Sequence, residues 1–269
     1  MLVICNGMPR SASTWAFNVV VQLLHRSEPG AELYSGYDES VARFLESAPP
    51  TATHIVVKCH KLDPHGRALG QTAAARTIYT WRDPADAAVS CMEMFGYDFE
   101  RSLAEIESSL KLSLLHRRWG TTLIMSYREL TGAPVEAVER IATYLGLESN
   151  SDVVSAVARD NSLERMKEKQ LEFADEARLV QTGGVAYDRE TLLHRGHIRH
   201  GGSGYGREAL TPEQLRQCEA LLRRYVQHPR RAYILQRQAL TWRAVGPRQF
   251  GRLGFSPRAF LRSLRPHSD

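Results

Sequence analysis

The chain lacks long hydrophobic runs and contains few cysteines. No apolar stretch approaches the roughly 18 residues that a transmembrane helix needs, so no membrane-spanning segment is expected. The four cysteines (Cys5, Cys59, Cys91 and Cys218) are scattered without a CxxC pair, which argues against a disulfide framework or a structural zinc site and fits a reducing cytoplasm. The N-terminus has no basic segment and soon reaches Gly7, so we expect a buried strand there and not a signal peptide.

The charge of the chain is unevenly distributed. Of the net charge of +5, a balance of +8 lies from Pro229 onward, where nine arginines and one acidic residue occur, so residues 1–228 sum to −3. The charge therefore does not favour a nucleic-acid-binding protein. With 43% hydrophobic residues among 269, we expect one α/β domain over residues 1–228. Residues 229–269 are expected to be a basic helical extension of the same domain. Its segment Pro247–Pro266 either packs back on the domain, which we favour, or lies on an anionic membrane surface.

Hydrophobic patterns predict strands that alternate with helices. Short apolar runs rich in Val and Ile predict strands at Leu2–Cys5, Ile55–Lys58, Thr77–Trp81 and Leu123–Ser126. Helical patterns lie between or after them, at Ser13–His25, Glu39–Glu46, Pro84–Met94, Phe99–Arg117 and Val135–Leu145. This order predicts an α/β fold, with a P-loop-like central parallel sheet flanked by helices.

The region after Gly146 shows no strong strand and is predicted to form a helical C-terminal part. Helices are expected there at Ser151–Ala158, Leu163–Glu176, Thr211–Tyr225 and Arg231–Arg243. The segment Arg195–Gly206 between them has too many glycines for a regular element and is expected to be a loop.

A candidate phosphate-binding loop follows the first predicted strand. Gly7 to Trp15 is rich in small and hydroxyl residues and opens a helix, whose N-terminus favours an anion. The alternative is an ordinary strand-to-helix turn with a Ser/Thr cap. The spacing is close to the ATP-binding pattern GxxxxGK[ST], but Ala12 replaces the second Gly and Ser13 replaces the Lys. A P-loop kinase that uses ATP and Mg²⁺ is therefore the second hypothesis, and a non-catalytic binder of nucleotides or RNA is the third.

Six segments, in this order along the chain, resemble the motifs of the cytosolic-type sulfotransferases that use 3′-phosphoadenosine 5′-phosphosulfate (PAPS). They are Pro9–Trp15 (PKSGTTW in the family), Val57–His60 (VKTH), Ile78–Ser90 (IYxxRNPxDxxVS), Tyr127–Leu130 (YEDL), Asn161–Met166 (TSFxxM) and Arg199–Arg207 (RKGxxGDWK). The resemblance implies a cytoplasmic enzyme that moves a sulfuryl group from PAPS to a hydroxyl or amine of a small-molecule, lipid or carbohydrate acceptor. It implies neither nucleic acid nor an integral membrane association.

The resemblance and the chemistry together give the catalytic candidates. Lys58 and His60 are two residues apart at a strand end, so their side chains share one face. By resemblance His60 is the general base, Lys58 acts on the bridging oxygen, and Arg10 replaces the loop Lys. An unperturbed imidazole titrates near ~6.5, which suits a base at neutral pH. The alternative for His60 is a side chain that only caps a strand.

The resemblance also gives the donor-binding candidates, which fall into three groups. The expected 5′-phosphate group is Arg10, Ser11, Ala12, Ser13 and Thr14. The expected 3′-phosphate group is Arg82, Ser90, Arg199, His200 and Gly201. The expected adenine group is Trp15, Tyr127, Ser162 and Leu163. Alternatives are an ion pair of Arg82 with Asp83 or Asp86 and core packing of Trp15. We expect Ala12 to be tolerated in place of Gly only with a negative φ.

Three further features bear on metal, acceptor and assembly. His194, His197 and His200 form an HxxHxxH pattern, but a glycine-rich setting would not align them, so no metal is expected. The acceptor side is expected at Glu28–Asp38 and Phe95–Phe99. The family's dimer motif, KxxxTVxxxE, is altered at Pro212 and Arg216, so we expect a monomer or a dimer that does not use this motif.

Overall fold

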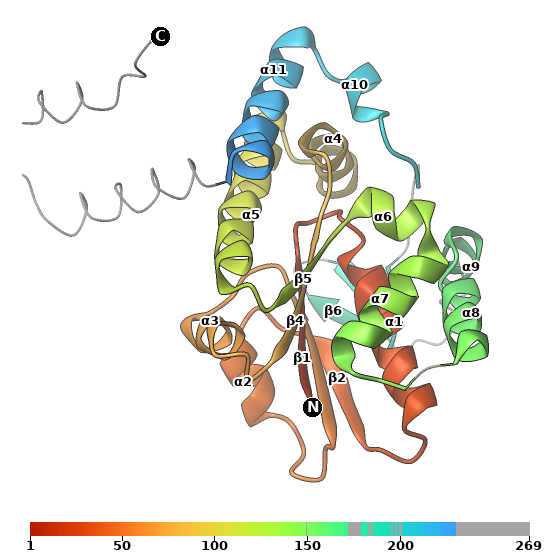
Figure 1. Ribbon diagram of the computed structural model, residues 1–269. Helices are drawn as coiled ribbons and strands as arrows, with labels where there is room; N and C mark the ends of the chain where they lie inside the picture. Colours follow the sequence, from red (N-terminus) through yellow and green to blue (C-terminus); the bar gives the residue numbers. More distant parts are fainter. Residues whose placement is uncertain are drawn as a thin grey trace, which may run out of the picture.

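A five-stranded parallel sheet forms the centre of the computed structural model, which describes residues 1–148, 150–171, 179–182, 185–194, 196, 198 and 201–229 (Figure 1). The strand order is β2-β3-β1-β4-β5, and every neighbouring pair is parallel. The bounds are β1 Leu2–Gly7, β2 Leu33–Tyr37, β3 His54–Cys59, β4 Arg76–Trp81 and β5 Thr122–Ser126. The predicted α/β fold with a central parallel sheet flanked by helices is confirmed.

Helices cover both faces of this sheet. Alternate residues of β1 point to opposite faces: Val3 and Cys5 pack toward one helical layer, and Ile4 packs toward the other. The first layer contains α1 (Ser13–Ser27), α7 (Pro134–Leu145) and α8 (Ser151–Asp160), and the second contains α2 (Val41–Glu46), α3 (Pro64–Gln71) and α5 (Phe99–Trp119). Figure 1 shows α1, α7 and α8 on one side of the sheet and α2 and α3 on the other.

A third apolar cluster lies beyond the carboxyl ends of the strands. There α4 (Pro84–Phe95) packs against α5 and α11 (Pro212–Leu221), and Tyr225 of the π-helical turn Leu222–Gln227 belongs to the same cluster. The remaining helices are short: α6 (Tyr127–Gly132), α9 (Leu163–Lys169) and α10 (Gly206–Ala209). This cluster holds α4 next to the carboxyl end of β4. The candidate site residues Arg82, which follows β4, and Ser90, which lies on α4, are therefore held in place by it.

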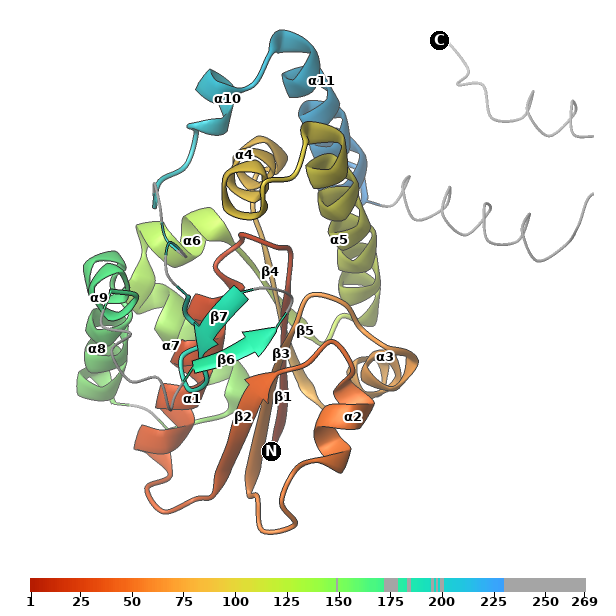
Figure 2. The same cartoon turned by 180° about the vertical axis from the view of Figure 1, so that it is seen from behind.

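Several sequence expectations are corrected by the structure. The edge strand β2 was not predicted because all five of its residues, including Ser35 and Gly36, are only half-buried and form no apolar run. A hairpin of β6 (Leu179–Thr182) and β7 (Val185–Asp188) also lies where no strand was expected, and Figure 2 shows it beside α1. Its strands have four residues each, too few for a clear alternation.

The predicted helices agree with the structure except near their ends. The helix expected from Glu39 begins at Val41, because Ser40 caps it, and the helix expected at Leu163–Glu176 is described as α9, which ends at Lys169. Helices α3, α6 and α10 were missed; α3 contains two glycines and begins at Pro64. The helix expected at Arg231–Arg243, and the extension after Pro229, lie outside the described residues. Within the described residues, no helix has both the length and the apolar character needed to cross a membrane.

Candidate active site

The candidate site lies where β1, β3 and β4 end side by side. The phosphate loop leaves β1 at Gly7, whose close approach to β4 leaves no room for a side chain: a Cβ there would lie 2.3 Å from Thr80 Oγ1. The Met8 N–H then donates to the Thr80 carbonyl (2.9 Å), which holds the start of the loop against β4. The loop runs directly into α1, as the sequence predicted.

Two residues of this loop have left-handed backbone conformations. Arg10 and Ala12 both have φ of 65°. The condition under which we expected Ala12 to be tolerated in place of Gly, a negative φ, is therefore not met, and this alanine occupies a conformation that favours glycine. Ala12 is also the N-cap of α1 and supplies no side-chain capping bond. The first-turn N–H groups of α1 lack acceptors within the helix, so they can donate to a phosphate.

The hydroxyl of Ser11 braces the loop. Ser11 is fully buried; its Oγ donates to the Met8 carbonyl (2.6 Å) and lies 2.7 Å from Thr80 Oγ1. Ser13 and Thr14 are almost as buried at the start of α1. The Ser11 hydroxyl is thus engaged with the protein, which leaves backbone N–H groups, Ser13 and Thr14 as the donors that this loop can offer.

Lys58 and His60 meet at the end of β3. Lys58 is 5% exposed, and its Nζ lies 3.2 Å from His60 Nε2 and 4.9 Å from the centre of the Tyr37 ring. His60 Nδ1 lies 2.8 Å from the Gly7 carbonyl, which can only accept a hydrogen bond. The proton of neutral His60 therefore belongs on Nδ1, and Nε2 carries the lone pair that faces Lys58.

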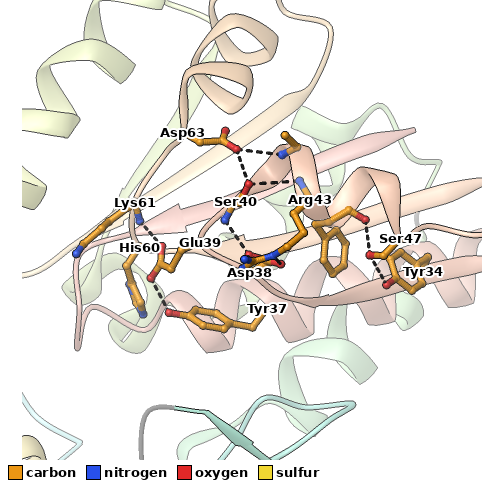
Figure 3. A network of polar contacts seen from close by, with 12 residues as sticks. Tyr34, Tyr37, Asp38, Glu39, Ser40, Arg43, Ser47, His60, Lys61 and Asp63 are labelled. Carbon is orange, nitrogen blue, oxygen red and sulfur yellow. Dashed lines mark hydrogen bonds and ion pairs between the residues drawn. The ribbon is translucent and has the colours of Figure 1, made fainter.

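Glu39 joins the end of β2 to the end of β3 (Figure 3). Its Oε2 accepts the N–H groups of His60 (3.0 Å) and Lys61 (2.7 Å), and its Oε1 accepts the Tyr37 hydroxyl (2.5 Å). Tyr37 in turn lies against Lys58. We therefore assign Glu39 as a residue that positions the Lys58–His60 pair.

The electrostatics of the pair favour a charged lysine and a neutral histidine. Burial lowers the pKa of Lys58 to about 8, and the negative charge of Glu39 opposes that fall. Burial, with the adjacent Lys58 ammonium, lowers the pKa of His60 to about 3. The expectation of an ordinary imidazole pKa at His60 is not met, because desolvation and a neighbouring cation both disfavour its charged form.

Arg82 lies at the end of β4 between two aromatic rings. Its guanidinium carbon is 3.8 Å from the centre of the Tyr127 ring and 5.3 Å from that of Tyr205. Its Nη1 donates to the Arg10 carbonyl (3.3 Å), whereas its buried Nε has no hydrogen-bond partner among the described residues. Tyr127, expected beside adenine, holds Arg82 in place in this structure.

The acidic neighbours of Arg82 have other principal partners. Asp83 caps α4 by accepting the Ala85 N–H (2.9 Å). Asp86 lies 3.9 Å from Arg82 Nε, but its two oxygens accept the N–H groups of Gly204 and Gly206, each at 2.8 Å. Asp86 thus anchors the glycine-rich segment near Arg82, and the alternative of a close Arg82–Asp ion pair is weak in this geometry.

Arg10 brings a second guanidinium to the same place. Its Nε donates to Ser90 Oγ (2.9 Å), and its carbonyl accepts from Arg82. Burial lowers the pKa of Arg10, and the charge of Arg82 lowers it further. Two guanidinium groups and a hydroxyl gathered in this way suit an anion such as a phosphate. The structure therefore brings Arg10, Arg82 and Ser90 together, as expected for Arg82 and Ser90.

The remaining candidates lie along a neighbouring wall. Trp15 Nε1 donates to the Asn161 carbonyl (2.8 Å), which holds the half-buried indole beside the segment that contains Ser162 and Leu163. Ser162 caps α9, and a Cβ at Gly201 would lie 2.7 Å from Leu163. Trp15, Ser162, Leu163 and Gly201 are thus near one another, whereas Arg199 and His200 lie outside the described residues.

A cavity of about 480 Å³ adjoins His60. Helix α5 lines one side, and Pro9, Glu39 and the segment from His60 to Arg67 line the other. Neither Glu28–Asp38 nor Phe95–Phe99, the segments expected on the acceptor side, contributes to this lining. The residues whose roles our sequence analysis missed are Glu39, Tyr37 and Tyr205, because these roles depend on contacts between distant segments and not on a local pattern.

Of the HxxHxxH pattern, His194 lies within the described residues. His194 is buried, whereas His197 and His200 lie outside the described residues. In the part of the chain that is described, no group of three His, Cys, Asp or Glu side chains is arranged to hold a metal ion.

Known proteins provide an independent comparison. The family model described as "Sulfotransferase domain" matches residues 2–229. Among solved structures, mouse sulfotransferase SULT7A1 complexed with PAP is similar at 18% identity, with 88% of each chain covered and a TM-score of 0.64. Retinol dehydratase in complex with androsterone and the inactive cofactor PAP is similar at 16% identity, with 84% of this chain and 81% of that chain covered and a TM-score of 0.60. No curated protein sequence matches the chain.

Proposed function

The chain belongs to the sulfotransferase family, and on this premise we propose that it transfers a sulfuryl group from PAPS to a hydroxyl or amine acceptor. The observation that carries the proposal is the Lys58–His60 pair at the end of β3, beside the uncapped N-terminus of α1 and the Arg10–Arg82–Ser90 cluster. The alternative of an ATP- and Mg²⁺-dependent kinase is not favoured by the family match.

The residues present fit a donor with two separate phosphates. The N-terminus of α1 lacks a side-chain cap, and the buried Arg82 Nε lacks a hydrogen-bond partner among the described residues. We assign the 5′-phosphate to Ser13, Thr14 and the first-turn N–H groups, and the 3′-phosphate to Arg82 and Ser90. When bound, PAPS supplies an activated sulfuryl group on a phosphate leaving group.

His60 and Lys58 divide the chemistry between a base and an electrostatic stabiliser. The bond from sulfur to the acceptor oxygen or nitrogen forms while the bond from sulfur to the phosphate oxygen breaks, and the phosphate keeps the electron pair. His60 Nε2 takes the acceptor proton, since Nδ1–H is held by the Gly7 carbonyl. The Lys58 ammonium, 3.2 Å from Nε2 in this structure, moves to the leaving oxygen and frees Nε2.

A thermal-shift comparison tests the donor assignment. We expect 3′,5′-ADP to raise the melting temperature, and we expect ATP with Mg²⁺ to raise it less or not at all. Stabilisation by ATP with Mg²⁺ alone would remove the PAPS assignment. Incubation with PAPS and an acceptor panel, followed by mass spectrometry for the gain of a sulfuryl group, then tests the reaction.

We also propose a cytoplasmic location and an assembly that does not use the family's dimer motif. The four cysteines are free and buried, which supports the proposed cytoplasmic location. Arg216 pairs with Glu213 of its own helix, and Arg207 lies 3.6 Å from Glu219. Thr211 caps α11, and Pro212 lies in its first turn. These contacts support a chain that does not use the family's dimer motif, and light scattering would test that expectation.

A further inference from the structure

Most of the residues that line the cavity beside His60 have polar or charged side chains, which bears on the chemical class of the acceptor. Nine of its thirteen lining residues are polar or charged. The apolar part is restricted to Pro9 and three leucines, Leu62, Leu112 and Leu115. The leucines and the aliphatic stems of the charged side chains can pack against an apolar part of an acceptor, while polar groups of the lining can orient its hydroxyls.

Most of the charged groups in this lining are already engaged within the protein. Glu39 accepts from His60 and Lys61, and Asp63 accepts the N–H groups of Gly66 and Ala42 (2.7 and 3.0 Å). Lys111 pairs with Glu107 at 3.3 Å. These charged groups are therefore partly satisfied within the protein and are less available to bind a ligand.

Among the described residues, two charged side chains of the lining, Lys61 and Glu105, have no such partner, and of these two only Glu105 is half-buried. It lies on α5, is half-buried and lines the cavity, yet no hydrogen bond or ion pair engages its carboxylate among the described residues. Its charge is felt at α4: burial raises the pKa of the Cys91 thiol to about 11, and Glu105 contributes to that rise. The exposed Ser108, less than one turn further along α5, also lines the cavity. A bound acceptor thus meets an unused carboxylate and a hydroxyl of α5 in the cavity that His60 also lines.

We propose that the acceptor is a hydroxyl-rich, carbohydrate-like molecule and that Glu105 selects it by accepting hydrogen bonds from hydroxyls next to the one that reacts. This inference rests on the proposed sulfotransferase function. An apolar acceptor would strip water from the Glu105 carboxylate without replacing its hydrogen bonds, which is strongly unfavourable. A hydroxylated acceptor replaces them, and sites of this kind reject analogues that lack the matching groups.

Two acceptors that share a phenyl group test the proposal. Phenyl β-glucoside carries several hydroxyls, whereas 2-phenylethanol carries one. With PAPS as donor, we expect the kcat/KM of the wild-type chain for the glucoside to exceed that for the alcohol by about tenfold or more. Glu105→Leu should remove most of this preference by raising the KM for the glucoside, and Glu105→Gln should give an intermediate loss because a neutral acceptor forms weaker hydrogen bonds.

Controls separate failure of this inference from failure of the proposed function. Glu139→Leu, at an exposed glutamate in the middle of α7, should leave the preference unchanged. The melting shift with 3′,5′-ADP should be the same in all variants, because none of these residues belongs to the donor site. An equal or greater rate with 2-phenylethanol, an unchanged preference in Glu105→Leu, or donor binding without transfer to any glycoside would overturn the inference. Absence of both the nucleotide shift and all transfer would instead count against the proposed function.

Discussion

Replacement of Glu39 by Gln tests whether the charge of Glu39 keeps the catalytic Lys58 protonated. The substituted amide would keep the shape of the side chain and could still accept the N–H groups of His60 and Lys61, but the change removes the negative charge. Lys58 must be protonated to stabilise the leaving oxygen, and burial already lowers its pKa to about 8. Glu39 opposes that fall, so its neutralisation should move the pKa of Lys58 further down.

The size of the effect follows from the titration of Lys58. With a pKa of about 8, Lys58 is roughly three-quarters protonated at pH ~7.5, and a loss of about one unit leaves roughly one-quarter. The kcat/KM of Glu39→Gln should therefore fall about threefold at pH ~7.5 and about eightfold at pH ~8.5. Near pH ~6 both proteins hold a protonated Lys58, so the two rates should agree within roughly 10%.

A pH profile of kcat/KM at saturating PAPS distinguishes this effect from damage to the fold. A merely structural defect would lower kcat/KM by the same factor at every pH. Loss of the charge would instead move the fall of kcat/KM at high pH, the basic limb of the profile, to lower pH. Glu46→Gln, at an exposed glutamate of the adjacent α2, is the matched control and should leave the profile unchanged. A basic limb that does not move in Glu39→Gln would refute the argument that Glu39 sets the charge of Lys58.

Three further outcomes are expected. His60→Ala should reduce turnover by ~10²-fold or more because the base is lost, while the melting shift with 3′,5′-ADP stays; near-normal turnover would exclude His60 as the base. Arg82→Ala and Ser90→Ala should each weaken the binding of 3′,5′-ADP by ~1.5–3 kcal/mol and the binding of 5′-AMP far less, as measured by calorimetry. An equal loss of affinity for both nucleotides would mean that these residues only support the fold. Ala12→Gly should stabilise the chain by ~0.5–1 kcal/mol, because φ at this position is 65° and glycine adopts it without a steric penalty. Thermal denaturation without ligand measures the last change, and a lower melting temperature would contradict it.

The sequence predicted the elements whose signals are local. β1, β3, β4 and β5 follow from Val- and Ile-rich runs, and the start of α11 follows from Thr211 and Pro212. The placement of Lys58 beside His60 follows from strand alternation. In each case the residues that determine the structure are within a few positions of one another.

The rest depends on contacts between segments far apart in the chain. Glu39 was assigned to the first position of a helix, and only the pairing of β2 with β3 brings it to the backbone of His60. The left-handed conformation of Ala12 runs against residue preference, so composition alone could not indicate it. Likewise, neither the loss of basicity at His60 nor the unused carboxylate of Glu105 has a sequence pattern, because both depend on burial and neighbours.

The low pKa of His60 explains why donor binding should precede proton transfer to this residue. Without ligand, the base is desolvated, and the charges of Lys58 and Arg10 both lower its affinity for a proton. Binding of an anionic donor next to these cations would offset their charges and draw Lys58 away from Nε2. The pKa of His60 should then rise by the part of the shift that Lys58 and Arg10 cause, while the larger effect of burial remains. The residue is thus a stronger base with the donor in place than without it, because the donor offsets the same two cations that weaken it in the free protein.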